Sequence, residues 1–364
     1  MTRLNPENER LKRRYIRYLE QADGLAPITI DNALRAVVAF EHFTNGRDFG
    51  KLRDKDAHAY KMHLLEGKDG RAANRATVQG KLKPVQRFFR WLAEQDGYRN
   101  KIRYGDVKFF NLSRNDQQIA RDHRVKPTPE LEQVLKVVRA MQATTDVELR
   151  DRAIICCALL TCPRVSALIT LKLKHVRQDR LGIDQDGREV HTKFGKSFTS
   201  FFFPVGDDIR DMFLDYVDHL RTLGWDDDDP LFPQTERAIA AVREGRPLRL
   251  IRKHWATPDP IRAIFRRALA AGGMPYYTPH SLRRTIARFG MSLCNSADKI
   301  KAWSQNLAHQ DVLTTFTNYG SLTPEKQGEI ILSMNSAEAT DEQALDALFD
   351  LLKTDPRFRA KMEK

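Results

Sequence analysis

Two segments near the C-terminus combine histidine, arginine and tyrosine at spacings that suit phosphate chemistry. The first is Thr278-Pro279-His280-Ser281-Leu282-Arg283-Arg284-Thr285. Thr278 is a good N-cap and Pro279 suits the first helical position, so we expect a helix to begin here. His280 and Arg283 would share one face of it, beside free N–H groups and a positive dipole end that attract anions. Such a pair alone is more often a solvated helix face.

The second segment is Leu307-Ala308-His309-Gln310-Asp311-Val312-Leu313-Thr314-Thr315-Phe316-Thr317-Asn318-Tyr319. A tyrosine this close to a histidine can share a pocket with it, and an activated phenol is a nucleophile. The alternative is that Tyr319 is a packing aromatic whose hydroxyl is hydrogen-bonded.

A third segment places an arginine at a break between two apolar stretches. The apolar helix Ala153 to Leu160 ends at Cys162-Pro163, and a second helix led by Arg164 follows. An arginine in this position cannot be buried unpaired. Its guanidinium must therefore reach a carboxylate, backbone carbonyls or a bound anion.

A hairpin-like region carries two lysines between these segments. Gln185-Asp186-Gly187-Arg188 supplies a turn, Gly195 marks a second tight turn, and Phe198 to Phe203 is a strand candidate. Lys193 and Lys196 lie in Thr192-Lys193-Phe194-Gly195-Lys196.

The order of arginine, hairpin lysine, His-x-x-Arg, histidine and tyrosine resembles the tyrosine recombinase (phage integrase) family over nearly the whole chain. Each motif alone is weak, but together, in order and at plausible spacing, they are specific. The matching positions are Arg164 for the Arg of Thr-Gly-x-Arg-x-Ser-Glu-Leu, Lys193 for the hairpin lysine, His280 and Arg283 for His-x-x-Arg, His309 for Leu-Gly-His and Tyr319 for the nucleophile.

The chain departs from the family pattern at several of these motifs. Cys162 and Pro163 replace the usual Gly-x before the arginine, and Ala308 replaces the glycine before His309. Ala167 stands where a glutamate is common, and Arg284 where a histidine is frequent. The separation from His309 to the tyrosine is also one residue longer than usual. No other tyrosine lies downstream of His309, and we expect Tyr276 and Tyr277 to be packing residues.

The resemblance implies a mainly α fold with a small β-sheet. It would comprise an N-terminal helical, SAM-like core-binding bundle that clamps DNA and a mixed α/β catalytic domain. The implied partner is double-stranded DNA with a specific target site. The implied assembly is a synaptic tetramer on DNA, and we expect a monomer in free solution.

The residue types also imply roles in breaking a phosphodiester. Arg164 and Arg283 can each donate two hydrogen bonds to non-bridging oxygens. Lys193 is the candidate general acid, and His280 takes the tyrosine proton or orients the phosphate. His309 would hydrogen-bond the phosphate, and Tyr319 would form a covalent 3′-phosphotyrosyl link that needs no ATP. No acidic cluster suggests a two-metal site, so we expect neither metal nor cofactor.

Charge and cysteine usage fit a polyanion-binding protein of the cytosol. The net charge of +13 is uneven, because residues 1–125 carry 26 Lys and Arg against 16 Asp and Glu. The remaining 239 residues carry 35 against 32. A basic first third points to nucleic acid. The cysteines lack zinc-type spacing, so we expect reduced, buried residues. We find no signal peptide or membrane-spanning run, and expect a cytoplasmic, nucleoid-associated protein.

The first third of the chain is predicted as a set of helices. They run from Glu9 to Gln21, from a cap at Thr29 to before Gly46, from Asp54 to near Gly67, and from Ala76 to Glu94. One polar face suits phosphate and base-edge contacts, with a merely solvated face as the alternative. Its residues are Arg75, Gln79, Lys83, Gln86 and Arg90.

We predict a DNA-clamp domain over residues 1–110, a linker over 111–129, a catalytic domain over 130–335 and a helical tail over 336–364. The first catalytic-domain helix should run from Pro129 to Met141 after a cap at Thr128. The basic segment 234–257 resembles an insertion. A DNA-contacting loop and a solvated surface loop are equal alternatives for it.

Three functions remain open from the sequence. The first is a site-specific DNA recombinase. The second is a catalytically silent DNA-binding accessory protein of the same fold, which the six filled catalytic positions disfavour. The third is a type IB topoisomerase-like DNA-relaxing enzyme, which uses the same chemistry without synapsis.

Overall fold

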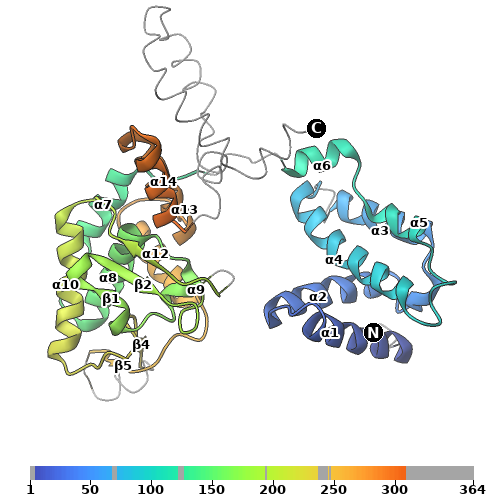
Figure 1. The fold of residues 1–364 in the computed structure, drawn as a ribbon, viewed down its shortest axis with the longest axis horizontal. Coiled ribbons are helices and arrows are strands. Elements are labelled where there is room, and N and C mark those ends of the chain that lie inside the picture. Colours follow the sequence, from blue (N-terminus) through green and yellow to red (C-terminus); the bar gives the residue numbers. More distant parts are fainter. Residues whose placement is uncertain are drawn as a thin grey trace, which may run out of the picture. The chain divides into compact units, whose positions relative to one another are not determined.

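The computed structural model describes residues 5–67, 72–121, 127–192, 195–236, 245 and 247–308. They form two compact units that divide between residues 124 and 125 (Figure 1). His309, Tyr319, Lys193 and the predicted tail 336–364 lie outside the described residues.

The first unit is entirely helical in the part that the structure describes. Its α-helices are α1 (Pro6–Gln21), α2 (Pro27–Phe43), α3 (Asp54–Glu66), α4 (Arg75–Glu94), α5 (Tyr104–Val107) and α6 (Arg114–Arg121). Two 3₁₀ turns, η1 (Phe49–Lys51) and η2 (Lys108–Phe110), connect them. The second helix begins three residues before its predicted start, because Ala26 rather than Thr29 is the N-cap and Pro27 occupies the first helical position.

Aromatic side chains fill the core of the first unit. Phe88 and Phe89 of α4 are fully buried, whereas Arg90 between them and Trp91 is exposed. Phe40 of α2 meets Phe89 edge to face at 5.2 Å between ring centroids. This packing fixes which face of α4 is turned to solvent.

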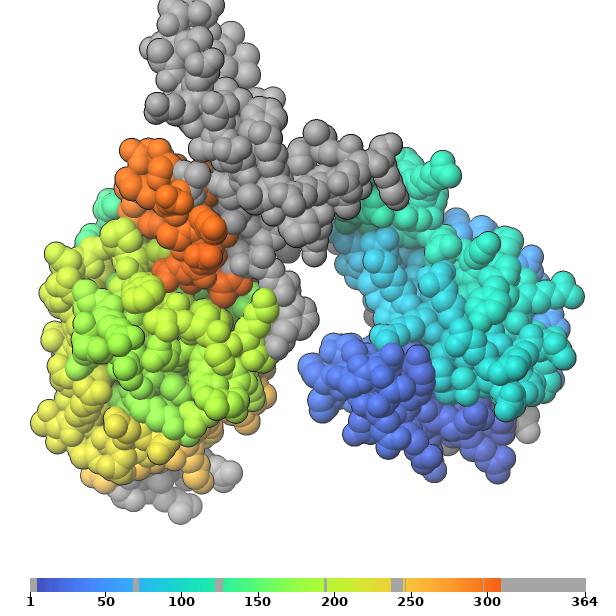
Figure 2. Space-filling model, viewed as in Figure 1, coloured from blue at the N-terminus to red at the C-terminus, as the bar shows by residue number. Residues whose placement is uncertain are grey.

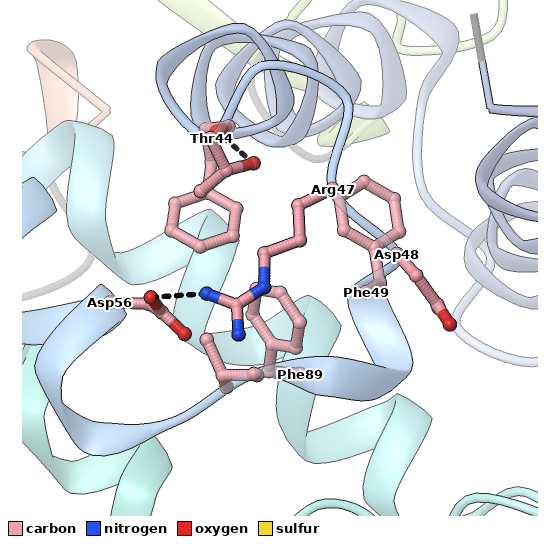
Figure 3. Close-up of a pocket in the computed structure, with 8 residues that line it drawn as sticks. Thr44, Arg47, Asp48, Phe49, Asp56 and Phe89 are labelled. Carbon is pink, nitrogen blue, oxygen red and sulfur yellow. Dashed lines mark hydrogen bonds and ion pairs between the residues drawn. The ribbon is translucent and has the colours of Figure 1, made fainter.

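A small pocket lies between the end of α2 and the start of α3 (Figure 3). Arg47 reaches into it, and its Nη1 donates a hydrogen bond of 2.7 Å to Asp56 Oδ1. The rings of Phe49 and Phe89 line the same space. The pocket is thus lined by an internal ion pair that joins the loop after α2 to α3.

Helix α6 lies within residues 111–129, which the sequence analysis predicts as a linker. Arg75 Nε of α4 donates to Asp116 Oδ1 of α6 at 2.7 Å, and Ser113 Oγ donates to Asp116 Oδ2. Residues 114–121 are therefore a helix tied to the first unit, and the linker prediction is wrong for them. The polar composition of this stretch reflects an exposed helix.

The second unit contains helices, a three-stranded sheet and a two-stranded sheet. Its helices are α7 (Leu131–Ala140), α8 (Asp146–Thr161), α9 (Val165–Leu168), α10 (Asp207–Thr222), α12 (Asp259–Ala271), α13 (Pro279–Leu293) and α14 (Ala297–Asn306), with the 3₁₀ turns η3 (Leu173–His175) and η4 (Gln178–Arg180). Its strands are β1 (Val176–Arg177), β2 (Gly182–Gln185), β3 (Phe198–Phe201), β4 (Gln234–Thr235) and β5 (Leu250–Ile251).

Helix α8 is the centre of this unit, packed by α7, α10, α12 and α13 (Figure 1). Its residues from Ala153 to Thr161 are all buried, as expected for a helix that is apolar on every side. A capping box between Thr145 and Glu148 sets its start. Arg164 follows three residues after the end of this buried helix.

The larger sheet is antiparallel in the order β1-β2-β3, with Ile183 opposite Ser200. The second sheet joins β4 to β5 at the base of the basic segment 234–257. The buried Arg150 of α8 donates to the carbonyl of Pro233 and to Thr235 Oγ1, which holds that base in place. A mainly α fold with small β-sheets is confirmed.

Candidate active site

The arginine motif begins where α8 ends. Cys162 has φ 47° and ψ 44°, the left-handed conformation that glycine adopts most readily. Arg164 follows Pro163 as the half-buried N-cap of α9. The carbonyl of Leu160, left free by the helix end, accepts a hydrogen bond of 2.7 Å from the Phe203 N–H beyond β3. This bond ties the end of α8 to the strand region just before the turn that leads to Arg164.

Arg283 of α13 lies against this same turn. Its Nη1 donates to the Cys162 carbonyl at 2.6 Å, a contact between residues 121 positions apart in sequence. The side chain is buried, with 5% exposure. Its Nη2 has no hydrogen-bond partner among the described residues, although it is also buried. A donor in this state is available for an oxyanion, because buried polar groups are otherwise nearly always paired.

The predicted start of α13 is confirmed, with Thr278 at the N-cap and Pro279 in the first turn. The Thr278 side chain makes no capping bond, however, and its hydroxyl pairs with Ser281 Oγ at 3.1 Å. His280 is exposed on the first turn, and Arg283 follows one turn later. The first turns of α13 thus carry an exposed His280 and a buried Arg283 whose guanidinium contacts the turn before Arg164.

The segment leading to Lys193 is fixed to α9. Ser166 Oγ donates to the His191 carbonyl at 3.1 Å, and the His191 N–H donates to Thr170 Oγ1 at 3.0 Å. A side chain at Gly187 would collide with the backbone of Gly195, so this turn requires glycine there. The arginine motif thereby holds the chain two residues before Lys193.

Hydrogen bonds of His175 secure the base of this loop. His175 Nδ1 accepts from the Lys172 N–H at 3.0 Å, and its Nε2 lies 3.0 Å from Glu189 Oε2. Burial lowers the pKa of His175, while hydrogen bonds from Lys174 and His175 lower the pKa of Glu189. A neutral His175 with its proton on Nε2 satisfies both contacts.

The thiol next to the arginines is chemically inactive. Burial raises the pKa of Cys162 to about 12, although the positive charge of Arg283 opposes this. The side chain therefore stays a neutral thiol near pH 7 and does not compete as a nucleophile.

Neither His309 nor Tyr319 is among the described residues, which end at Ala308. Ala308 has φ 49°, so the position where the family has glycine is again left-handed. Tyr276, expected to pack, has the guanidinium of Arg266 over its ring at 4.8 Å.

No group of three or more metal-ligating side chains occurs in the searched part of the chain. Within those residues no helix is long and apolar enough to cross a membrane.

The predicted DNA face of α4 is only partly available. Lys83 and Arg90 are exposed and Gln79 is half-buried, whereas Arg75 is paired with Asp116. Gln86 is buried, and its Nε2 donates to Asn111 Oδ1 at 2.8 Å. The prediction that Gln86 contacts DNA is therefore wrong, because its amide is used inside the unit.

Sequence reasoning missed the residues that hold the segments of the candidate site together. Ser166 could have been identified because it lies in the arginine motif. No motif in the sequence indicates the role of Thr170. Asn306 bonds to β3 through both ends of its side-chain amide. Only the fold brings it to that strand.

Comparisons with known proteins identify the family of the chain. The model of the phage integrase family matches residues 130–326, which include all six predicted catalytic positions. Tyrosine recombinase XerC of Escherichia coli O157:H7 is 22% identical over 318 residues, covering 86% of this chain and 91% of its own. XerC of Shigella flexneri serotype 5b is also 22% identical, over 315 residues with the same coverage.

Solved structures share the fold. XerH site-specific recombinase bound to palindromic difH substrate aligns with a TM-score of 0.62 at 14% identity, covering 88% of this chain and 84% of its own. A lambda integrase(75-356) dimer bound to a COC′ core site aligns with a TM-score of 0.59 at 16% identity, covering 85% and 94%. With a family model matched over more than half of its length, this chain belongs to the phage integrase family of tyrosine recombinases.

Proposed function

We propose that this chain is a site-specific DNA recombinase that cuts and rejoins strands through a 3′-phosphotyrosyl intermediate, with Tyr319 as nucleophile. The observation that carries the proposal is the contact of Arg283 Nη1 with the Cys162 carbonyl, at the turn that presents Arg164. This contact supports the proposal because it holds Arg283 against a turn only two residues before Arg164 in the chain.

Two arginines suit the charge that develops during the reaction. Attack of the Tyr319 oxygen on phosphorus passes through a state with extra charge on the non-bridging oxygens. Fixed donors aimed at that charge stabilise it by about 2.7–4 kcal/mol each. Arg283 is held rigidly by burial and by its bond to Cys162, and its Nη2 remains for the phosphate.

Two proton transfers complete the exchange. The bond from Tyr319 oxygen to phosphorus forms as the bond from phosphorus to the 5′ oxygen breaks. We assign the phenol proton to His280, which is exposed on the first turn of α13. We assign Lys193 as the acid that protonates the leaving 5′ oxygen, and His309 as a hydrogen-bond donor to the phosphate. Rejoining reverses these steps.

The proposed partner is double-stranded DNA with a specific site, met by both units. In this scheme the first unit clamps the duplex and the second cuts it. A mobile-element integrase working on the nucleoid as a synaptic tetramer fits the family, with the 336–364 tail docking onto a neighbouring subunit.

Deleting residues 338–364 should spare binding and cleavage at one site but weaken two-site complexes.

The test uses nicked suicide duplexes covering the DNA that flanks the chain's own coding region. A recombinase should trap a covalent adduct on a defined duplex, and should recombine two copies of that site. Relaxation of a plasmid lacking the site would favour the topoisomerase alternative. Specific binding without an adduct would favour the accessory protein.

A further inference from the structure

Helix α14 ends on the edge of strand β3. Asn306 Nδ2 donates to the Phe201 carbonyl at 2.9 Å, and the Phe201 N–H donates to Asn306 Oδ1 at 2.7 Å. In Figure 2 the orange surface of α13 and α14 adjoins yellow-green segments of the same unit. A single planar amide thus satisfies both backbone groups of one strand residue.

This contact lies where the sheet has no further strand. The described sheet has the order β1-β2-β3, so β3 has one paired edge and one open edge. Asn306 covers the open edge as a neighbouring strand would. The link extends inward, because Ser200 Oγ donates to the Asn306 carbonyl at 3.3 Å and accepts from Gln185 Nε2 of β2 at 3.1 Å.

The rest of α14 is held equally firmly. Trp303 packs on Phe203 at 4.6 Å between ring centroids, and its Nε1 donates to the Ile286 carbonyl at 3.2 Å. Trp303 also fills the space where a side chain at Gly290 would lie. The end of α14 therefore has a fixed direction, and the chain continues from Asn306 through Leu307 and Ala308 to His309.

We propose that Asn306 is a positioning residue that couples His309 to strand β3 and so to the loop that carries Lys193. The proposal rests on the catalytic role proposed above for His309. Both catalytic segments would then share one hydrogen-bonded frame, with Asn306 at the join. Asparagine fits because one end of its side chain donates and the other accepts, whereas aspartate only accepts and leucine does neither.

The experiment measures single-turnover cleavage of the suicide duplex that gives the highest adduct yield. Asn306→Ala should slow cleavage by about 10- to 100-fold with little change in DNA affinity, because small displacements of catalytic groups have effects of this size. Asn306→Asp, which keeps only the acceptor, should give an intermediate rate. Gln305→Ala, on the exposed neighbouring position, is the matched control and should cleave normally.

A double-mutant cycle separates positioning from general stability. If Asn306 acts through His309, Asn306→Ala should have little further effect in a His309→Ala background. Equal slowing in both backgrounds would overturn the proposal, as would normal cleavage by Asn306→Ala. A His309→Ala chain that cleaves at the full rate would instead refute the role of His309.

Hydrogen exchange tests the link without DNA. The Phe201 amide should be protected in the unaltered chain and in Gln305→Ala, and should exchange at least 10-fold faster in Asn306→Ala, which removes its acceptor. Asn306→Asp keeps that acceptor and should keep more of the protection than Asn306→Ala. Unchanged protection in Asn306→Ala would contradict the coupling even if no duplex yielded an adduct.

Discussion

At the scale of single residues, Arg283 has two separable tasks. The Nη1 group holds the turn before Arg164 through the Cys162 carbonyl, whereas the buried Nη2 has no partner within the part of the chain that the structure describes. A lysine ammonium cannot reproduce this planar, divided arrangement, even though it keeps the charge.

Arg283→Lys should therefore lower the cleavage rate by about 100- to 1000-fold, the usual effect of losing one such donor. DNA affinity should change far less. Single-turnover cleavage measures the effect, with Arg284→Lys, the next residue along α13, as control. Normal cleavage by Arg283→Lys would show that this arginine serves only the fold.

Ala308 is a second informative residue, because it adopts a left-handed conformation at φ 49°. That conformation costs a non-glycine residue about 1–2 kcal/mol, which a glycine would avoid. Glycine also raises the conformational entropy of the unfolded chain, and this partly cancels the gain in stability. Ala308→Gly should raise the free energy of unfolding by up to about 1 kcal/mol in denaturant titration. Ala302→Gly, at an exposed position inside α14, should lower it by about 1 kcal/mol. Equal losses in both variants would contradict this backbone geometry.

At the scale of elements, the loop that carries Lys193 is secured at its base by His175 and Glu189. Both groups have a pKa in the folded chain that is below the usual value. As pH falls, the unfolded chain therefore binds more protons at these groups than the folded chain does. Their contribution to stability is full above about pH 6.5, and it is lost as pH falls through the lowered pKa of His175 and then that of Glu189.

The unfolding temperature should therefore fall between about pH 6.5 and 5. His175→Gln should be less stable at neutral pH but should show a flatter profile across this range, because its amide does not titrate. Thermal unfolding followed by circular dichroism provides the measurement. Parallel profiles for the two chains would rule out His175 as the source.

Much of the helical framework was predictable because its signals are local. Pro279 after Thr278 marks the start of α13, and Gly67, with φ 73°, ends α3. The start of α7 was placed two residues early, since the chain remains extended to Glu130. The bond from Arg283 to Cys162 and the use of Asn306 by β3 were not predictable, because both depend on contacts between segments far apart in sequence.

At the scale of the whole molecule, charge and chemistry are divided between two units. The first third of the chain carries most of the excess positive charge, whereas the six predicted catalytic residues all follow residue 130. With this division, the basic first unit would supply most of the DNA affinity and the second unit the cleavage. Because contacts between basic side chains and phosphates supply that affinity, it should depend on salt.

Lys83→Gln and Arg90→Gln should each reduce the slope of log affinity against log salt by about 1, if each contacts one phosphate. Gln86→Ala should leave the slope unchanged and lower stability by about 1 kcal/mol, because the hydrogen bonds of its buried amide to Asn111 and to the Val107 carbonyl are lost. Fluorescence anisotropy across a salt series distinguishes the two effects. Unchanged slopes for both basic variants would move the DNA surface away from α4.

The most direct test of the account is the chemistry at Tyr319. The unaltered chain, trapped on a suicide duplex and digested, should yield one nucleotide-linked peptide that contains Tyr319. Tyr319→Phe should bind the same duplex with unchanged affinity and form no adduct, because only the attacking oxygen is lost. An adduct that persists in Tyr319→Phe, or one mapped to Tyr277, would contradict the proposed mechanism.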